Sequence, residues 1–407
     1  MSMMSGRPPP EAIDTKWEQS EVELPNLVVL ASRLKATDWQ LIRTIARRMH
    51  LALQVEEFKR KKEEKIYRRK VETDRMQQAR EWAQELGINP DFVASILYLL
   101  IGESCKMQMI QMQDTERHRP EFASPDEVYA WQKEQLFELT KRWAPSYEQD
   151  YSEGYFGTRL YLDFEDGVIR EVVAGLDETV LALDLGCATG RQSFCMDSLF
   201  ARVLGFDISP DMINIANQRK PEGSSAAFSV QDLETGIPVQ SESASFATMG
   251  LGFASDMRNI RFVLEEVKRV LVPAGMAVLS FYNRDALIYR WNFIPWPVSL
   301  AAEIDLDHHC LDVHWRNKST ANDDEHNPEA MRTIFSIFAR PYTFAQVEEL
   351  LPRGMAIVKQ CTYPTVASIL PSILFEDVAV RESVVDVDRF LASQNHGAYL
   401  LVVVRKT

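Results

Sequence analysis

Cysteine is scarce in this chain of 407 residues, and long apolar runs are missing from it. The five cysteines are odd in number and scattered without CxxC spacing, which argues against a disulfide framework and against a zinc site. The acids and histidines of residues 305–314 are the alternative metal ligands, but none of their histidines has HxxxH spacing, so no metal is expected. No stretch approaches the ~18 apolar residues that a membrane span needs, and the first residues lack the apolar core of a signal peptide. We therefore expect a cytoplasmic protein with no membrane partner, in which residues 1–24 are disordered.

Positive charge is also in deficit, because 45 Lys and Arg residues stand against 59 Asp and Glu residues, for a formal net charge of -14. Neutralising phosphates requires clustered Lys and Arg, so we expect no nucleic-acid partner and favour a small-molecule substrate. Hydrophobic residues make up 46% of the chain, which is enough to bury sizeable cores, and the length predicts two domains.

The second half of the chain carries a strand, a small-residue loop and a second strand that ends in an acid. An apolar run over residues 180–185 is followed by a loop with Gly186 and Gly190, and Asp207 ends the next apolar run, 23 positions after Asp184. The two glycines allow a tight turn and a close approach to a ligand, and a carboxylate can accept hydrogen bonds from both hydroxyls of a ribose. This arrangement is typical of nucleotide binding.

The loop resembles that of class I S-adenosylmethionine-dependent methyltransferases more than that of dinucleotide-binding dehydrogenases. Asp184 beside the loop would repel a pyrophosphate and suits a cationic ligand, although an ordinary strand-turn-helix would also account for the glycines. The resemblance implies S-adenosylmethionine as cofactor and a contact from Asp232 to the adenine amine, for which a plain turn acid is the alternative. The cofactor-binding residues expected from it are Asp184, Gly186, Cys187, Ala188, Gly190, Asp207, Ile208, Met212, Asp232, Leu233 and Gly250.

Further helices and strands follow in the order of that fold. An apolar-faced helix over residues 260–271 is expected to stop at Pro273-Ala274-Gly275 before a strand over residues 276–281. The segment from Thr343 to Gln346 has the pattern of a capping box and predicts a helix start. Other strands are expected at residues 202–206, 227–230, 245–249, 355–360 and 398–404, the last two pairing as an antiparallel hairpin at one edge of the sheet.

Residues 25–113 have a helical pattern throughout. Apolar residues recur at spacings near three, four and seven from Leu27 to Val55, which predicts one helix of ~40 residues with an apolar stripe. Two shorter helices are expected over residues 71–86 and from Asn89-Pro90 to residue 113, since Asn and Pro suit a helix start. Three helices cannot bury such a stripe alone, so a homodimer through this region is expected.

This helical region resembles the all-helical chorismate mutases, and a generic dimeric bundle is the alternative. In that family an arginine and a lysine of the first helix bind the substrate's carboxylates, an acid of the second helix holds a hydroxyl, and a serine and a glutamine follow on the third helix. These functions fall on Arg48, Lys59, Glu72, Ser104 and Gln108.

Three positions depart from the mutase pattern. The arginine that reaches in from the partner subunit falls on Ala31, and the aspartate and arginine that open the second helix fall on Arg68 and Val71. Mutases catalyse their reaction by binding a dianion in a compact conformer, so the loss of two arginines that bind its carboxylates weakens catalysis. Dimerisation or ligand binding is therefore the retained role that we expect for this region.

Two further segments are expected to connect or cover the domains. Residues 114–144 are expected to be a connector whose helix starts at Ser124-Pro125 and ends near Trp143. Residues 283–340 are too long for a simple connection, and they either cover the substrate or form a dimer-contacting hairpin. The substrate-binding residues expected are Tyr151, Tyr155, Tyr282, Arg340 and Tyr342. A general base for a hydroxyl or amine acceptor is expected among His308, His309 and His314.

The chain is therefore expected to be multidomain, of α and α/β class. An all-α chorismate mutase-like domain at residues 25–113 and the connector precede a Rossmann-like, seven-stranded methyltransferase domain at residues 145–407. The favoured hypothesis is a methyltransferase that acts on a small, carboxylated or aromatic metabolite. The alternatives are a bifunctional chorismate mutase and methyltransferase with a chorismate-derived substrate, and a binding protein that senses an anionic metabolite.

Overall fold

The structure is a computed structural model of the whole chain. It describes residues 27–61, 69–116, 122–153, 156–176, 179–290, 300–305, 309–315, 333–370, 375 and 377–407. The expected disorder of residues 1–24 lies outside these ranges, as do Tyr155 and His308.

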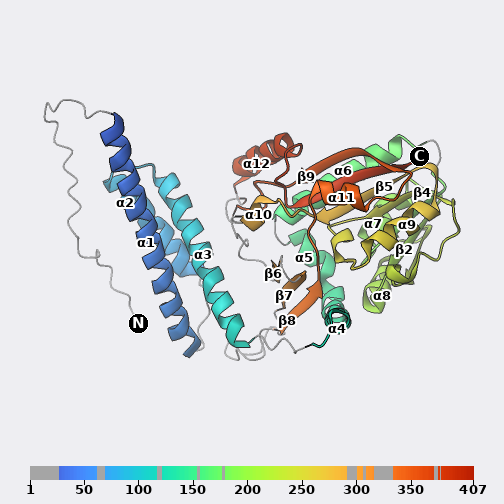
Figure 1. Cartoon of the computed structure of the whole chain (residues 1–407), viewed down its shortest axis with the longest axis horizontal. Helices are drawn as coiled ribbons and strands as arrows, with labels where there is room; N and C mark the ends of the chain where they lie inside the picture. The colour runs from blue at the N-terminus through green and yellow to red at the C-terminus, as the bar shows by residue number, and fades with distance from the viewer. Residues whose placement is uncertain are drawn as a thin grey trace.

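The expected N-terminal helices are confirmed as α1 (Leu27–Lys61), α2 (Arg69–Glu85) and α3 (Pro90–Glu116). Figure 1 shows α1 and α3 running side by side, and α3 packs against both α1 and α2. The side chain of Asn89 accepts hydrogen bonds from the backbone N–H groups of Asp91 at 2.9 Å and Phe92 at 3.2 Å, so Asn89 caps α3 as predicted.

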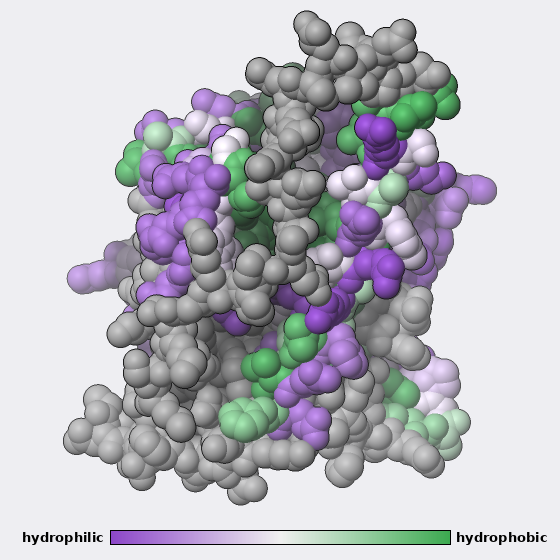
Figure 2. Space-filling view, turned by 90° about the vertical axis from the view of Figure 1, so that its left-hand side faces the viewer, coloured by the Kyte–Doolittle hydropathy of each residue, from purple (hydrophilic) through white to green (hydrophobic). Residues whose placement is uncertain are grey.

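The apolar stripe of α1 is exposed in the single chain. Leu34 is 65% exposed and Leu41 is 57% exposed, and α2 and α3 add Trp82 and Phe92 at 42% and 59%. Figure 2 views the molecule from the side on which α1 lies in Figure 1, and apolar residues interrupt the hydrophilic surface there. The three-helix unit thus leaves apolar area in water that a further packing partner would cover.

The described residues after α3 contain a seven-stranded sheet of order β3-β2-β1-β4-β5-β10-β9. The first five strands in this order are parallel, while β10 runs antiparallel to both of its neighbours. The strands are β1 (Leu181–Leu185), β2 (Arg202–Asp207), β3 (Ala226–Val230), β4 (Ala244–Met249), β5 (Leu271–Tyr282), β9 (Met355–Tyr363) and β10 (Tyr399–Lys406). The predicted antiparallel pairing of the last two strands at one edge is confirmed, but they do not form a simple hairpin, because α12 (Val378–Leu391) separates them.

Helices cover both faces of this sheet, which has the Rossmann-like architecture expected from the sequence (Figure 1). One core packs α9 (Ile260–Val270) and α11 (Phe344–Leu350) against the strands, and the other packs α6 (Phe156–Ala174), α7 (Arg191–Asp197) and α12. Successive strand residues face opposite cores, as Leu183 and Ala182 do in β1. Thr343 and Gln346 form the predicted capping box at the start of α11.

The start of β5 differs from the prediction. A turn was expected at Pro273-Ala274-Gly275, but β5 already pairs with β4 at Leu271 and continues to Tyr282. The pairing register shifts between Ala244 and Phe246, so a bulge accommodates these residues within the strand, with Ala274 at a φ of 64°.

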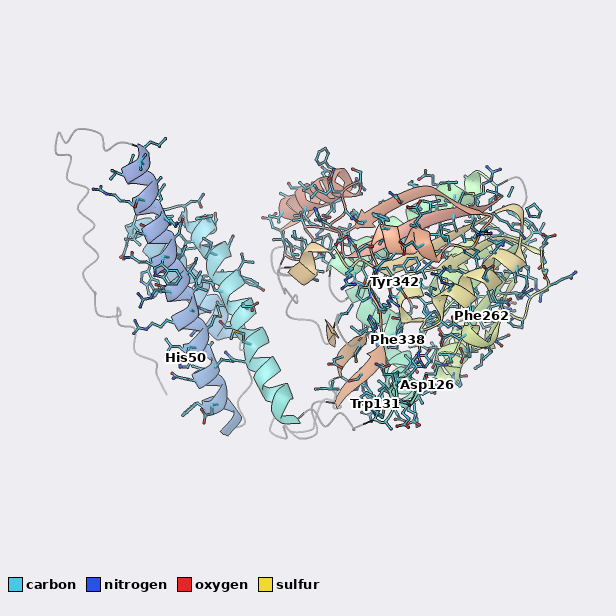
Figure 3. The ribbon with its side chains drawn as sticks, viewed as in Figure 1. His50, Asp126, Trp131, Phe262, Phe338 and Tyr342 are labelled. Carbon is cyan, nitrogen blue, oxygen red and sulfur yellow. The ribbon has the colours of Figure 1, made fainter. Side chains whose placement is uncertain are left out.

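The segment expected to cover the substrate contains a three-stranded antiparallel sheet of β6 (Leu300–Asp305), β7 (Cys310–Trp315) and β8 (Thr333–Phe338). The expected connector helix is α4 (Pro125–Trp143), capped by Ser124, and it packs against β8. The rings of Tyr129 in α4 and Phe338 in β8 have centroids 5.5 Å apart, and Figure 3 labels Phe338 together with Asp126 and Trp131 of α4. Leu139 of α4 shares a small core with these strands, so the helix belongs structurally to the cover of the sheet domain.

Candidate functional site

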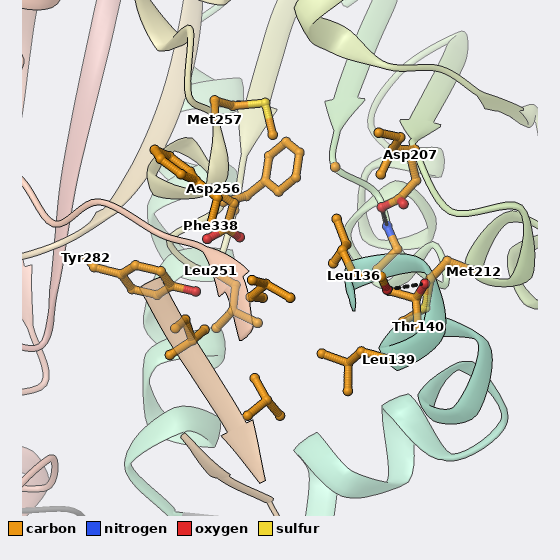
Figure 4. A pocket seen from close by; sticks show the side chains of 18 of the residues that line it. Leu136, Leu139, Thr140, Asp207, Met212, Leu251, Asp256, Met257, Tyr282 and Phe338 are labelled. Carbon is orange, nitrogen blue, oxygen red and sulfur yellow. Dashed lines mark hydrogen bonds between the residues drawn. The ribbon is translucent and has the colours of Figure 1, made fainter. Parts of the chain in front are cut away.

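A cavity of about 470 Å³ opens at the carboxyl ends of β1, β2, β4 and β5, where ligands bind in sheets of this kind. Its walls come from the loops after these strands, from α4, from α5 (Tyr147–Glu153) and from β7 and β8. In Figure 4 Asp207 and Met212 lie on one side of the cavity, and Asp256 and Tyr282 lie on the other. The volume suits a ligand of cofactor size.

The loop after β1 has the tight geometry that its glycines predict. Gly186 has a φ of 79°, and its N–H donates to the carbonyl of Phe206 at 2.8 Å, as that of Cys187 does at 2.9 Å. A Cβ on Gly186 would lie 2.4 Å from the ring of Phe253, so a larger residue does not fit. The loop therefore brings bare backbone to the cavity wall.

Asp207 joins this loop to the end of β2. Its Oδ2 accepts a hydrogen bond from the Ala188 N–H at 2.9 Å, and its Oδ1 accepts one from the Ser209 N–H at 2.8 Å. Burial raises the pKa of this carboxyl, although the backbone donors oppose the rise. Each carboxylate oxygen keeps a further lone pair, and Asp207 lines the cavity, so it can still accept hydrogen bonds from a ligand.

Two acids that follow β3 lie at the same end of the cavity as Asp207 and contact α4. Asp232 Oδ2 lies 2.7 Å from Lys133 Nζ, while Asp232 Oδ1 accepts from the Glu234 N–H at 3.0 Å. Glu234 accepts a hydrogen bond from the Tyr129 hydroxyl, and Lys133 also lies over the Tyr129 ring, 5.0 Å from its centroid. Asp232 thus lines the cavity as expected, but its carboxylate already binds α4.

Asp184 lies behind the loop and outside the cavity lining. The residue is 1% exposed, and its Oδ2 accepts a hydrogen bond from Ser193 Oγ at 2.6 Å. Burial raises the pKa of Asp184 to about 6, and Ser193 and Arg191 oppose that rise. Asp184 therefore supports the start of α7 in this structure and has no direct access to the cavity.

Glu165 was not predicted and organises the loop after β4. It is fully buried in α6 and accepts hydrogen bonds from the Leu251 N–H at 3.0 Å, Gln192 Nε2 at 2.6 Å and the Tyr161 hydroxyl at 3.0 Å. Burial raises the pKa of Glu165 to about 7 against the opposing effect of Arg191. The sequence signal that could have identified it is an acid on the apolar face of a helix.

Asp256 was also missed, and it faces the cavity from the short 3-10 helix Ala254–Asp256. Its Oδ1 is buried and has no hydrogen-bond partner among the described residues. Burial alone raises the pKa of this carboxyl well above its usual range. The only signal in the sequence was its place shortly after the strand that precedes Gly250.

The structure brings most of the predicted cofactor residues together around one cavity. Those that line it are Gly186, Ala188, Asp207, Ile208, Met212, Asp232, Leu233 and Gly250, with Tyr151 and Tyr282 of the expected substrate residues. Asp184, Cys187 and Gly190 are not in the lining. Arg340 and Tyr342 line a separate cavity of about 290 Å³.

The expected histidine bases do not take part in the described lining. His309 is partly buried, has a φ of 52°, and its ring lies 6.4 Å from that of Phe338, outside the lining. His308 lies outside the described residues, and the side chain of His314 does too.

In the three-helix unit, Arg48 of α1 meets Ser104 of α3, and Gln108 lies one turn further along α3. Arg48 donates to the Leu100 carbonyl at 2.6 Å and to the Ser104 hydroxyl. Gln108 is 5% exposed, and its Oε1 has no hydrogen-bond partner among the described residues. The side chains of Lys59 and Glu72 lie outside the described ones, so the five expected positions are only partly placed.

Two family models match the chain in the regions where the motifs lie. Residues 30–109 match chorismate mutase type II, and residues 182–275 match a methyltransferase domain. Each resemblance drawn from the motifs is thereby confirmed at the level of the family.

Individual relatives match part of the chain. The demethylmenaquinone methyltransferase of Oceanobacillus iheyensis is 32% identical over 120 residues, which are 27% of this chain and 48% of that protein. The Bacillus subtilis protein YqeM is 26% identical over 114 residues, or 28% of this chain and 46% of that protein. The chain thus spans about half the length of these relatives. A solved S-adenosylmethionine-dependent methyltransferase of Clostridium acetobutylicum is 15% identical, covering 60% of this chain and 92% of its own, with a TM-score of 0.43.

None of the helices in the described ranges is both long enough and apolar enough to cross a bilayer.

Replacing Gly186 by Ala tests the close packing of the loop. Gly223 has the same φ of 79° but no atom within 4 Å of its missing Cβ, so Gly223→Ala is a matched control for backbone strain. Both changes carry about 1–2 kcal/mol of strain, and Gly186→Ala adds about 1–3 kcal/mol of overpacking against Phe253. Equal losses in the two variants, measured by urea unfolding, would show that the loop is not tightly packed.

Asp184→Asn tests the buried carboxyl by its dependence on pH. Because the pKa of Asp184 is raised in the folded protein, its bound proton stabilises the fold. This contribution to the free energy of unfolding is complete below the usual pKa of 3.8 and is lost as pH rises through about 6. The full loss is about 3 kcal/mol, of which about 1 kcal/mol falls between about pH 5 and about pH 7.5. In urea unfolding we expect wild type to lose this much stability relative to the variant, and parallel pH profiles would contradict it.

Proposed function

We propose that this protein is an S-adenosylmethionine-dependent methyltransferase that acts on a small metabolite. The observation that carries the proposal is the Asp207 carboxylate, which lines the cavity at the end of β2 and is bonded to the loop after β1. The methyltransferase family match over residues 182–275 supports it.

The residues around Asp207 fit this cofactor. Its two oxygens can accept the two ribose hydroxyls, and Ile208 and Met212 supply apolar contacts for an adenine beside it. Gly186 and Gly250 allow the rest of the molecule to lie against bare backbone at the ends of β1 and β4. When bound, S-adenosylmethionine supplies an electrophilic methyl group on a sulfonium.

The protein's own part is to position the acceptor and to exclude water. Helix α4 and strands β7 and β8 form walls over the ends of the sheet strands, and Leu139, Val313 and Ile337 give these walls an apolar surface. Such a cover favours the reading of residues 283–340 as a substrate-covering segment over that of a dimer contact. Tyr147, Tyr151 and Tyr282 in the lining suit an aromatic acceptor.

We also propose that the three-helix unit forms a homodimer. Its apolar stripe on α1 is exposed, with Leu34 and Leu41 more than half in water. Arg48 is occupied by the Leu100 carbonyl and Ser104, and Ala31 replaces a family arginine, so dimerisation is the role that we favour over mutase catalysis.

Asp207→Ala tests the cofactor site. The change removes two charge-assisted hydrogen bonds to the ribose, so we expect the affinity for S-adenosylmethionine in calorimetry to fall roughly a hundredfold. Asp211→Ala removes a carboxylate from the next turn, outside the cavity lining, and serves as control. Unchanged binding in a folded Asp207→Ala protein would overturn the proposal, and turnover to S-adenosylhomocysteine in wild type would exclude a pure binding protein.

Leu34→Glu combined with Leu41→Glu tests the dimer. Two charges in the stripe would have to be buried without partners, so we expect the molar mass from light scattering to fall from twice 46.6 kDa to 46.6 kDa. Ala36→Glu adds a charge on the opposite side of the same helix and should leave the mass unchanged. A wild-type mass of 46.6 kDa would refute the dimer.

A further inference from the structure

One acid in the cavity lining differs from all the others in having no partner. Asp256 lines the cavity, its Oδ1 is buried, and no described side chain or backbone group donates a hydrogen bond to it. The other lining acids accept from protein donors: Asp207 from Ala188 and Ser209, Asp232 from Lys133, Glu234 from Tyr129, and Asp150 from Trp143 and Ser146. A buried carboxylate oxygen without a donor is costly, so the Oδ1 atom of Asp256 is available for a ligand.

Asp256 lies at the opposite end of the cavity from the cofactor's nucleoside. Asp207 and Asp232 follow β2 and β3, on one side of β1 in the sheet order. Asp256 follows β4, and Tyr282 ends β5, on the other side of β1. Figure 4 shows Asp256 and Tyr282 facing Asp207 and Met212 across the cavity. With the nucleoside at Asp207, the end at Asp256 remains for the methyl acceptor.

Aromatic rings surround this end of the cavity. Burial is the main cause of the raised pKa of both Tyr151 and Tyr399, and the nearby Asp256 carboxylate adds to it, so the two hydroxyls lie within the electrostatic reach of Asp256. Tyr151 belongs to a ring cluster, with its centroid 4.8 Å from that of Tyr147 and 5.5 Å from that of Trp143. Ring faces beside a carboxylate form the surroundings in which proteins bind ammonium groups.

The charges of the lining residues also favour an ammonium group over a carboxylate. Lys133 is the single Lys or Arg among the described lining residues, and it is already paired with Asp232 at 2.7 Å and Glu234 at 3.6 Å. A carboxylated acceptor would therefore meet five acids and no unpaired cation in the described lining. An amine would instead supply the hydrogen-bond donor that Asp256 lacks.

We propose that Asp256 binds an amine nitrogen of the methyl acceptor, so that the acceptor is a small amine carrying an aromatic ring. This inference rests on the proposed methyltransferase function and deepens it by selecting among acceptor classes. Asp256 acts here as the residue that determines specificity, with Tyr151 and Tyr399 completing its end of the cavity.

The test uses the full-length protein saturated with S-adenosylhomocysteine and three matched probes. The probes are 2-phenylethylamine, 2-phenylethanol and phenylacetate, whose binding is followed by ligand-observed NMR titration near neutral pH. We expect wild type to bind the amine at least about tenfold more tightly than the alcohol or the acid. Asp256→Asn, which keeps the shape of the side chain, should abolish this preference without changing the affinity for S-adenosylhomocysteine. Asp386→Asn, on the exposed face of α12, should retain it.

The possible outcomes separate the two proposals. Failure of S-adenosylhomocysteine to bind wild type would overturn the proposed function itself. Normal binding of S-adenosylhomocysteine, combined with no binding of the amine, with equal binding of the three probes, or with a preference that survives in Asp256→Asn, would overturn only the role of Asp256.

Discussion

The site depends on the parallel pairing of β1 with β2. Because these strands end at the same edge, the Phe206 carbonyl can accept from Gly186 and Cys187, and the Asp207 carboxylate can accept from Ala188. The loop and the acid are therefore fixed to one another before any ligand arrives. A ligand that binds Asp207 is held against the bare backbone of the loop, which is how a preformed site limits the entropy lost on binding.

Buried carboxylates support this arrangement from behind. Glu165 fixes the loop after β4 by accepting from the Leu251 N–H, and Asp184 accepts from Ser193 at the start of α7. Both have raised pKa values because burial disfavours their charge, and both have protein donors that offset part of that cost. Asp256 has a raised pKa without any such donor. This difference separates Glu165 and Asp184, which have structural roles, from Asp256, which is free to bind a ligand.

The sequence was sufficient for the parts of the molecule that obey local rules. The apolar run before Gly186, the acid at Asp207 and the capping box at Thr343 all lie where their patterns predicted them. The cavity walls were harder to predict from the sequence, because α4 has the pattern of an ordinary amphipathic helix. Only its tertiary packing on β8 makes it part of the site. Asp256 and Glu165 were missed for the same reason, since neither belongs to a motif and both owe their character to burial.

The placement of α4 also bears on how the two regions of the chain were joined. The two family matches leave residues 110–181 unassigned, yet this stretch supplies Tyr129, Lys133 and Leu139 to the wall of the cavity. A gene segment that encoded only the seven-stranded sheet from residue 145 onward would lack that wall. The joint between the regions is therefore not a neutral spacer, and the sheet domain cannot be exchanged as a module without carrying α4 with it.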